Sequence, residues 1–132
     1  MFIETLNLSH FRNFSEVALS PSPKINIITG DNGSGKTSLL EAIYLLGFGR
    51  SFRPGGFRQL IKEGKPGFTV FCRSQDYAIG VRRSTDGEQS LRLNGANVQR
   101  MSDVARLVPV QLLTPESVDI LLEGPGQRRQ FI

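Results

Sequence analysis

The beginning of the chain alternates short apolar stretches with turn-forming residues. Apolar and β-branched residues favour a strand over 3–8, and residues 10–14 predict a turn. Residues 17–19 are then expected to pair back as a hairpin, which the prolines that follow interrupt because proline cannot donate to a strand ladder. The strongly β-branched run 25–28 predicts a strand buried on both faces, and it leads directly into a cluster of glycines.

From Lys36 onwards the apolar positions change to a helical period. They are Leu39, Leu40, Ile43 and Leu46. Glu41 lies between these main apolar positions. Gly47 and Gly49 are the expected terminators, because glycine readily adopts the left-handed conformation that ends many helices.

The middle of the chain predicts a loop followed by a small antiparallel sheet. Residues 50–67 are rich in glycine and proline and predict a long loop with one helical turn at 57–61. Three candidate strands follow, at 68–72, 77–82 and 90–93. Turn residues separate the strands, and Asn-Gly follows the third, so this region predicts an antiparallel meander.

The last part of the chain predicts a short helix at 102–107 and an apolar strand at 108–113. Thr-Pro-Glu at 114–116 then combines a capping residue, a first-turn proline and an acid, which predicts a helix over 117–122. Gly-Pro-Gly at 124–126 ends that helix, and the remaining residues begin an element that the chain does not complete. We therefore expect the chain to be part of a longer protein.

Composition narrows the class of protein. The chain has 132 residues, 39% of them hydrophobic and 21% charged, which is typical of one globular domain. No apolar run approaches the ~20 residues of a membrane helix, and the first residues do not resemble a secretory signal. The single cysteine, Cys72, lies in an apolar run and is expected to be buried. These features together predict a cytoplasmic protein.

The formal net charge of +4 permits a polyanionic partner. Basic residues are scattered through the middle of the chain: Arg50, Arg53, Arg58, Lys62, Lys65, Arg73, Arg82, Arg83, Arg92, Arg100 and Arg106. They are consistent with an ordinary solvated face and equally with a surface that binds nucleic acid. The sequence leaves both possibilities open.

The segment 30–37, Gly-Asp-Asn-Gly-Ser-Gly-Lys-Thr, fits the pattern of a phosphate-binding P-loop between a strand and a helix. Its glycines allow consecutive N–H groups to converge on a β-phosphate. Lys36 is predicted to lie between the β- and γ-phosphates, and Thr37 to ligate Mg²⁺. Ser38 is either a donor to the α-phosphate or a plain helix residue. The loop residues predicted to bind ATP are Gly30, Asn32, Gly33, Ser34, Gly35, Lys36, Thr37 and Ser38.

Hydrolysis by a site of this class needs acids as well. One acid at a strand end holds the magnesium, and a second orients the attacking water. The strand predicted at 108–113 ends in Thr-Pro-Glu, and Glu116 belongs to the first turn of a helix. Asp76 lies in a turn. With no acid in a suitable position, we expect the chain to bind ATP and Mg²⁺ but to be inactive alone.

Several stretches resemble one family of ATPases. The asparagine-containing loop looks like that of ABC and SMC-type heads, and residues 6–14, with Phe-Arg-Asn-Phe at the turn, are similar to the opening of SMC and RecF heads. Gly-Arg-Ser-Phe-Arg at 49–53 and the stretch 112–131 look like RecF in particular. The resemblance covers essentially the whole chain.

Together these features predict an α/β fold, the amino-terminal half of an ABC/SMC-type P-loop NTPase head, with a mixed sheet and an antiparallel β meander. We expect a single incomplete ATPase head over 1–132. It divides into a P-loop part (1–50), a loop and meander lobe (51–100) and a strand–helix segment (101–132).

The RecF resemblance implies a cytoplasmic ATPase that forms a homodimer around ATP, binds DNA at single-strand gaps, works with RecR and RecO, and assists RecA indirectly. It implies that Arg12 lies near the phosphates, although an exposed turn is nearly as plausible. Asn32 is either beside the γ-phosphate or a turn residue. The signature motif, coiled arm, acidic strand and histidine switch of RecF proteins have no counterpart here; His10 is expected at a turn or surface. Gln111 lies inside a predicted strand and is left unassigned.

Two other functions stay open. An ABC transporter ATPase subunit has a similar loop, but it typically stacks adenine on an upstream aromatic residue, whereas Phe11 and Phe14 flank a hairpin turn here. No segment resembles a transporter's coupling region. The third possibility is a nucleotide-binding or interaction fragment without catalysis.

Overall fold

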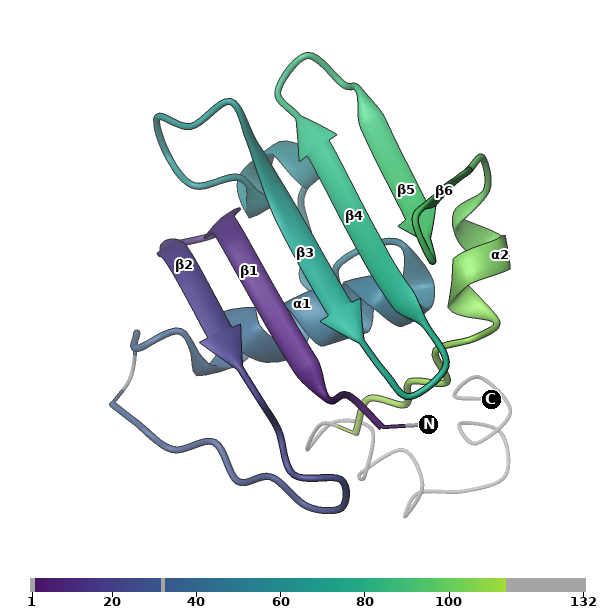
Figure 1. The fold of residues 1–132 in the computed structure, drawn as a ribbon. Helices are drawn as coiled ribbons and strands as arrows, with labels where there is room; N and C mark the ends of the chain where they lie inside the picture. The colour runs from purple at the N-terminus through teal and green to yellow at the C-terminus, as the bar shows by residue number, and fades with distance from the viewer. Residues whose placement is uncertain (1, 32, 114–132) are drawn as a thin grey trace, which may run out of the picture.

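A computed structural model describes residues 2–31 and 33–113 of the chain. Its centre is a six-stranded sheet in the order β2-β1-β3-β4-β5-β6, with each neighbouring pair antiparallel (Figure 1). The strands are β1 (Thr5–Phe11), β2 (Phe14–Leu19), β3 (Gly67–Arg73), β4 (Ala78–Ser84), β5 (Gln89–Leu93) and β6 (Ala96–Val98). The strands of the first hairpin and those of the meander therefore form one continuous sheet, which is antiparallel throughout the described residues where a mixed sheet was predicted.

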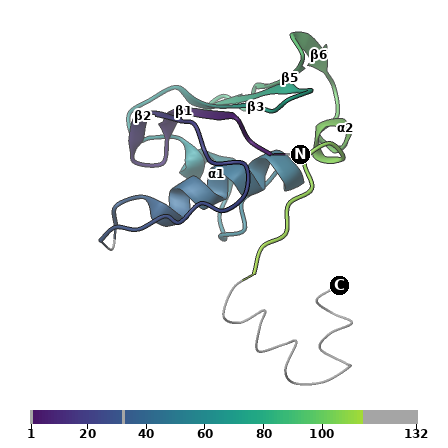
Figure 2. The same cartoon turned by 60° about the horizontal axis from the view of Figure 1, so that its bottom comes forward.

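Helix α1 (Lys36–Phe48) runs along one face of this sheet, together with the 3-10 turn Phe57–Leu60. The short helix α2 (Met101–Ala105) lies beside the β6 end (Figure 1). In Figure 2 the sheet forms an upper layer with α1 beneath it, and no helix of the described residues covers the opposite face. The structure is thus a two-layer arrangement with one open sheet face.

Strand alternation decides which residues enter the core. Along β3 the side chains of Phe68, Val70 and Cys72 are buried against α1, while the residues between them point to the open face. The other strands follow the same rule. The buried hydrophobic residues are Leu6, Leu8, Phe11, Ala42, Leu45, Leu46, Leu60, Ile61, Phe68, Val70, Cys72, Ile79, Val81, Leu91, Val104 and Val108.

The β1–β2 hairpin departs from regular strand geometry at two non-glycine residues. His10 and Arg12 have φ values of 52° and 55°, in the left-handed region that such residues rarely occupy. The turn at His10 redirects the chain so that Phe11 faces the core, where its ring meets Phe68 edge-on at 5.3 Å. The connection between Phe11 and Phe14 therefore projects Arg12 towards the start of α1 and away from the sheet.

Most of the predicted elements are confirmed. The first hairpin, the helix after the glycine cluster, the turn near 57–61, the three meander strands and the helix near 102 all appear within a few residues of their expected bounds. Strand β6 was not predicted. Asn94 and Gly95 form a two-residue turn with φ values of 52° and 83°, and Leu93 pairs with Ala96 across it.

Two predicted strands are wrong. Residues 25–28 form no strand, and Ile25 and Ile27 are 79% and 84% exposed. Residues 108–113 also lie outside any strand. Both segments border one apolar cavity of about 670 Å³ beside Leu39 and Ile43 of α1. Their apolar pattern anticipates burial, but no strand among the described residues pairs with either segment.

Helix α1 ends at Gly49, whose φ of 73° lets its N–H donate to the Leu45 carbonyl at 2.8 Å. Gly47, the other expected terminator, lies inside the helix and packs closely under Val110. The helix predicted at 117–122 and its cap at 114–116 lie outside the described residues. Within residues 2–31 and 33–113, no helix is long and apolar enough to cross a membrane.

Candidate nucleotide-binding site

The glycine-rich loop has the backbone conformation that its sequence predicts. Gly30, Gly33 and Gly35 have φ values of 155°, 82° and 99°, and Gly35 is the residue immediately before α1. A β-carbon at Gly35 would lie 2.4 Å from Cζ of Phe14, so glycine is needed both for its φ and for the close approach of the hairpin. The loop is therefore fitted against the β1–β2 hairpin.

The hydrogen bonds of the loop leave the helix end available. The backbone N–H of Ser34 donates to the Asp31 carbonyl at 3.1 Å, and the α1 ladder begins with Leu39 N–H donating to Gly35 at 3.0 Å. The N–H groups of the first turn before Leu39 have no helical carbonyl to bond. The ammonium of Lys36 donates to the Gly30 carbonyl of its own loop. A phosphate group would compete with that carbonyl for the lysine.

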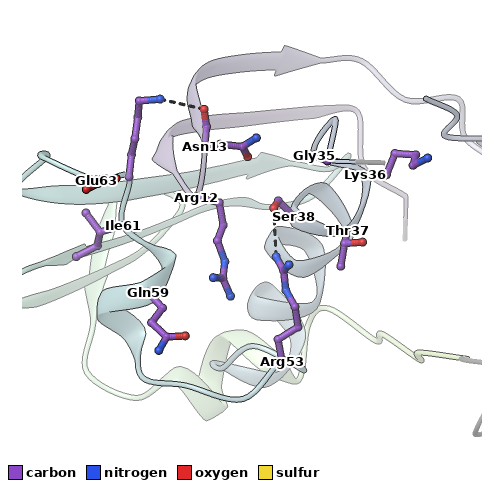
Figure 3. A pocket seen from close by; sticks show the side chains of 12 residues that line it. Arg12, Asn13, Gly35, Lys36, Thr37, Ser38, Arg53, Gln59, Ile61 and Glu63 are labelled. Carbon is purple, nitrogen blue, oxygen red and sulfur yellow. Dashed lines mark hydrogen bonds between the residues drawn. The ribbon is translucent and has the colours of Figure 1, made fainter. Parts of the chain in front are cut away.

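An open cavity of about 890 Å³ lies at this helix end. Three segments contribute to its walls, and they are far apart in the sequence: the hairpin turn, the P-loop with the first turn of α1, and the region 53–63 (Figure 3). The lining residues are Arg12, Asn13, Gly33, Gly35, Lys36, Thr37, Ser38, Arg53, Gln59, Ile61, Lys62 and Glu63. Among the described residues of this lining the cations outnumber the acid Glu63, which suits a polyanionic ligand.

A buried carboxylate organises two of these cations. Glu41 is fully buried in α1, and its carboxylate accepts hydrogen bonds from Arg12 Nε at 2.9 Å and from Arg12 Nη2 at 2.8 Å. Arg53 donates to the same carboxylate through Nε at 3.2 Å and through Nη2, and the Ser51 hydroxyl donates to it as well. The carboxylate thus fixes two guanidinium groups that come from separate loops.

Burial on its own raises the pKa of Glu41, but the hydrogen bonds from Arg12, Arg53 and Ser51 lower it from 4.5 to about 2. The same hydrogen bond to Glu41 raises the pKa of Arg12 above its ordinary value. The carboxylate therefore stays ionised at neutral pH, as a buried acid between two cations must.

Arg12 and Arg53 point into the cavity from opposite sides, whereas Lys36 points away from both (Figure 3). The backbone of Arg12 is held by a hydrogen bond from its N–H to the Leu60 carbonyl at 2.7 Å. Arg53 also donates to the Ser38 hydroxyl at 3.1 Å. Left-handed backbone at a non-glycine residue persists where the surroundings impose it, and such residues concentrate at functional sites.

Most of the predicted site residues meet in one place. Gly33, Gly35, Lys36, Thr37 and Ser38 line the cavity, and Arg12 lies opposite them. Gly30 and Ser34 lie in the loop but do not line the cavity, and Asn32 lies outside the described residues. His10 ends up in β1, half-buried, where its carbonyl accepts a hydrogen bond from Lys62 N–H at 2.8 Å.

Sequence reasoning missed Glu41, Ser51 and Arg53 as site residues. One signal was available for Glu41, because it lies three residues after Ser38 and four before Leu45, on the face of α1 that is buried. A charged residue on such a face is rarely buried without a partner. Its partners lie 29 and 12 positions away in sequence, so the spacing alone could not identify them.

Two carboxylates of the described residues lie at this site. Glu63 lines the cavity and is exposed, while Glu41 is engaged by the arginines. Among residues 2–31 and 33–113 no group of histidine, cysteine and acidic side chains could hold a metal ion by itself. The hydroxyl of Thr37 suits Mg²⁺ that arrives with a nucleotide, because that ion keeps several waters and phosphate ligands.

The sequence matches a known family and curated proteins within it. Residues 2–118 match the RecF/RecN/SMC N terminal domain. The chain is 98% identical over all 132 residues to "DNA replication and repair protein RecF" of Idiomarina loihiensis, and 46% identical to the protein of the same name from Shewanella baltica. It spans 37% and 38% of the length of these two relatives.

Solved structures of similar proteins have the same fold as this chain. A structure of the recombination mediator protein RecF–ATP matches with a TM-score of 0.82 and 30% identity, covering 98% of this chain and 36% of that one. An SMC ATPase described by its ATP-driven dimerisation and DNA-stimulated activation matches with a TM-score of 0.81 over 99% of this chain and 97% of that one. At 23% identity that likeness shows the fold alone. The predicted P-loop NTPase head of the ABC/SMC type is confirmed, and the chain belongs to the RecF/RecN/SMC amino-terminal domain family.

Proposed function

We propose that this chain is the ATP-binding part of a RecF-like DNA replication and repair protein. The observation that carries the proposal is the shared cavity, in which the P-loop and the start of α1 face two arginines fixed by Glu41. A triphosphate is the ligand that such a set of amides and cations fits best. The name of the relatives and the RecF–ATP structure support the same ligand.

Each residue has a role in this proposal. Lys36 exchanges the Gly30 carbonyl for the β- and γ-phosphate oxygens, and the loop glycines with Ser34 let the backbone amides approach. Thr37 ligates Mg²⁺, which neutralises phosphate charge when it is bound. Ser38 accepts from Arg53, so its own hydroxyl proton is free to donate to the α-phosphate. Asn32 is proposed to lie beside the γ-phosphate.

Arg12 and Arg53 have a different part in the site. Both guanidinium groups already satisfy Glu41, yet 22% and 34% of their side chains stay exposed at the cavity. Their charge therefore acts on a polyanion in the cavity without losing the partner that orients them. We infer that Arg12 is the phosphate-facing residue of the hairpin turn.

The whole protein is proposed to be a cytoplasmic ATPase that forms an ATP-dependent homodimer and binds DNA at single-strand gaps, with RecR and RecO as partners and RecA as an indirect one. The chain is then one incomplete head, made of a P-loop part (1–50), a loop and meander lobe (51–100) and a segment from 101 to 132. Hydrolysis requires acids and a signature motif that this chain does not supply in the described region.

Titration calorimetry with Mg-ATP on the full-length protein carrying this chain tests the nucleotide site. Lys36→Ala is expected to abolish binding while leaving the melting temperature unchanged, because the lysine packs no core. Lys24→Ala, an exposed lysine that does not line the cavity, is the matched control and should bind like wild type. Wild-type affinity in Lys36→Ala would refute the assignment.

Stimulation of ATP turnover separates this function from the alternatives. A RecF-like protein is expected to hydrolyse ATP faster when gapped DNA is added, whereas an ABC transporter subunit has no reason to respond to DNA. A fragment without catalysis would show binding but no turnover with any DNA. The isolated 132 residues are expected to show negligible turnover, and ready hydrolysis by them would mean that an acid has been overlooked.

A further inference from the structure

One acid in the wall of the nucleotide cavity has no part in the phosphate site. Glu63 is exposed and lines the cavity together with the P-loop, the start of α1 and the hairpin turn. Its carboxylate forms no ion pair within the described residues. A carboxylate repels phosphate groups, so the triphosphate gives it no role. Its oxygens are available to hydrogen-bond donors on another part of the ligand.

A tight turn fixes the position of Glu63. The backbone N–H of Lys65 donates to the Lys62 carbonyl at 3.0 Å, and Gly64 has a φ of 80°. A closed four-residue turn with this φ at its third residue is a type II turn, in which Glu63 is the second residue. The side chain therefore projects from a defined corner of the backbone.

The segment that carries Glu63 is also joined to the hairpin turn that carries Arg12. Lys62 donates through its backbone N–H to the His10 carbonyl at 2.8 Å, and through its ammonium to the Asn13 carbonyl at 3.0 Å. Both bonds are made by the residue immediately before Glu63. The two walls of the cavity are therefore held together on either side of Arg12.

Glu63 lies at the end of the cavity opposite the P-loop. In Figure 3 Lys36 and Thr37 are on one side, Arg12 stands between, and Glu63 is on the other side. The P-loop end takes the β- and γ-phosphates, so the nucleoside that follows the α-phosphate has the rest of the cavity. A volume of about 890 Å³ is large enough for a complete nucleotide. Glu63 is thus on the nucleoside side.

The wall around Glu63 suits a sugar better than a base. Its other lining residues are Asn13, Gln59, Ile61 and Lys62, and the apolar one, Ile61, is 8% exposed. No aromatic side chain of the described residues lines the cavity, so a base finds no ring there on which to stack. Ribose presents two adjacent hydroxyl donors, and the two oxygens of a carboxylate can accept both.

We propose that Glu63 binds the ribose of the nucleotide through its 2′- and 3′-hydroxyls, and that the site therefore selects ribonucleoside over deoxyribonucleoside triphosphates. The proposal rests on the proposed nucleotide-binding function. In dinucleotide-binding folds an aspartate or glutamate likewise accepts a hydrogen bond from the ribose 2′-hydroxyl. Hydrogen bonds to a charged group are stronger than those between neutral groups, so a missing hydroxyl weakens binding measurably.

Titration calorimetry on the full-length protein with Mg-bound ATP, 2′-deoxy-ATP and 3′-deoxy-ATP tests the proposal. Wild type is expected to bind ATP about tenfold more tightly than either deoxy form. Glu63→Ala is expected to bind all three nucleotides with equal affinity. Glu88→Ala removes an exposed acid that does not line the cavity, and this control should keep the wild-type preference for ATP.

Ratios of affinity between nucleotides are the informative quantity, because Glu63→Ala also removes a negative charge from the cavity. Loss of that charge strengthens the binding of all three triphosphates alike. Loss of a sugar contact weakens only the ligands that carry the hydroxyl. Glu63→Gln keeps one acceptor oxygen, so its preference for ATP is expected to lie between those of wild type and Glu63→Ala.

A wild-type protein that binds ATP and both deoxy forms equally would overturn the proposal and leave the nucleotide site intact. The wild-type preference in Glu63→Ala would overturn it as well, because another residue would then bind the sugar. If Glu63→Ala instead changes the preference for ATP over GTP and keeps that for ATP over the deoxy forms, the residue contacts the base and the assignment to ribose is wrong. A wild-type protein that binds none of these nucleotides would refute the proposed function itself.

Discussion

Replacing Glu41 by glutamine is expected to remove a pH-dependent part of the protein's stability. The carboxylate has a pKa of about 2 in the folded protein, against an ordinary value of 4.5. Because the folded pKa is the lower one, the unfolded state binds the proton more readily, and stability rises with pH between these two values. The shift corresponds to about 3 kcal/mol of stability, in the range found when one partner of a buried ion pair is removed.

This contribution is fully present above the unfolded-state pKa of 4.5 and is lost as the pH falls through about 2. Urea unfolding of wild type and Glu41→Gln at a series of pH values measures it. The difference in the free energy of unfolding is expected to be about 3 kcal/mol near neutral pH and to shrink steadily below 4.5. Glu88→Gln, at an exposed hairpin position, is the control and should change little at any pH.

A constant difference between wild type and Glu41→Gln over this pH range would refute the reasoning, because it would show that the carboxylate contributes through its shape alone. The variant also has a functional readout. Glutamine keeps one acceptor oxygen but replaces the other with an NH2 donor and removes the charge, so Arg12 and Arg53 lose part of the acceptor that orients them at the cavity. The affinity for Mg-ATP is therefore expected to fall even in buffers where the variant is fully folded.

Two further changes test the site and the core. Gly35→Ala is expected to lower the melting temperature and the affinity for Mg-ATP together, since its φ is 99° and the new carbon would lie 2.4 Å from Phe14; unchanged melting would mean that the hairpin yields easily. Burial raises the pKa of Cys72 to about 11, so its thiol is expected to react with iodoacetamide only as the protein unfolds. Rapid labelling of the native protein would contradict its place in the core.

The parts of the fold that sequence predicted are those set by neighbouring residues. The meander follows from alternating apolar positions and from turn pairs such as Asp86-Gly87, all of which act within a hairpin. Strand β6 could not be predicted from apolar alternation. It has three residues, and two of them are exposed. The Asn94-Gly95 pair before it was the usable signal, and it was interpreted as an end when it is a turn.

The apolar runs at 25–28 and 108–113 show the opposite error, because their apolar pattern predicts strands that the structure does not contain. Their composition predicts burial, but Ile25, Ile27 and Leu113 are exposed, and the two segments only border the apolar cavity next to α1. A strand also needs a neighbour for its backbone N–H and C=O groups. No strand among the described residues supplies that neighbour, so a hydrophobic pattern alone did not determine the local structure.

The candidate site was predictable where one short motif defines it, and unpredictable where it depends on contacts across the fold. Residues 33–38 were expected from the P-loop pattern, which fixes glycines, lysine and threonine within a few positions. Glu41 gains its role only when the hairpin turn and the segment after α1 come to the same place. A buried acid without known partners gives no indication of which cations will reach it.

The contact between the hairpin turn and Glu41 also explains why Arg12 keeps a left-handed backbone conformation. A φ of 55° is unfavourable for Arg12, and the residue would leave this conformation if nothing in the fold held it there. The Leu60 carbonyl and the Glu41 carboxylate hold the backbone and the side chain of the same residue. Since α1 begins at Lys36 and carries Glu41 one turn further on, the helix that presents amides to the cavity also fixes the opposite wall. A displacement of the P-loop or of the hairpin turn is therefore expected to shift the other one, because Glu41 connects helix α1 to Arg12.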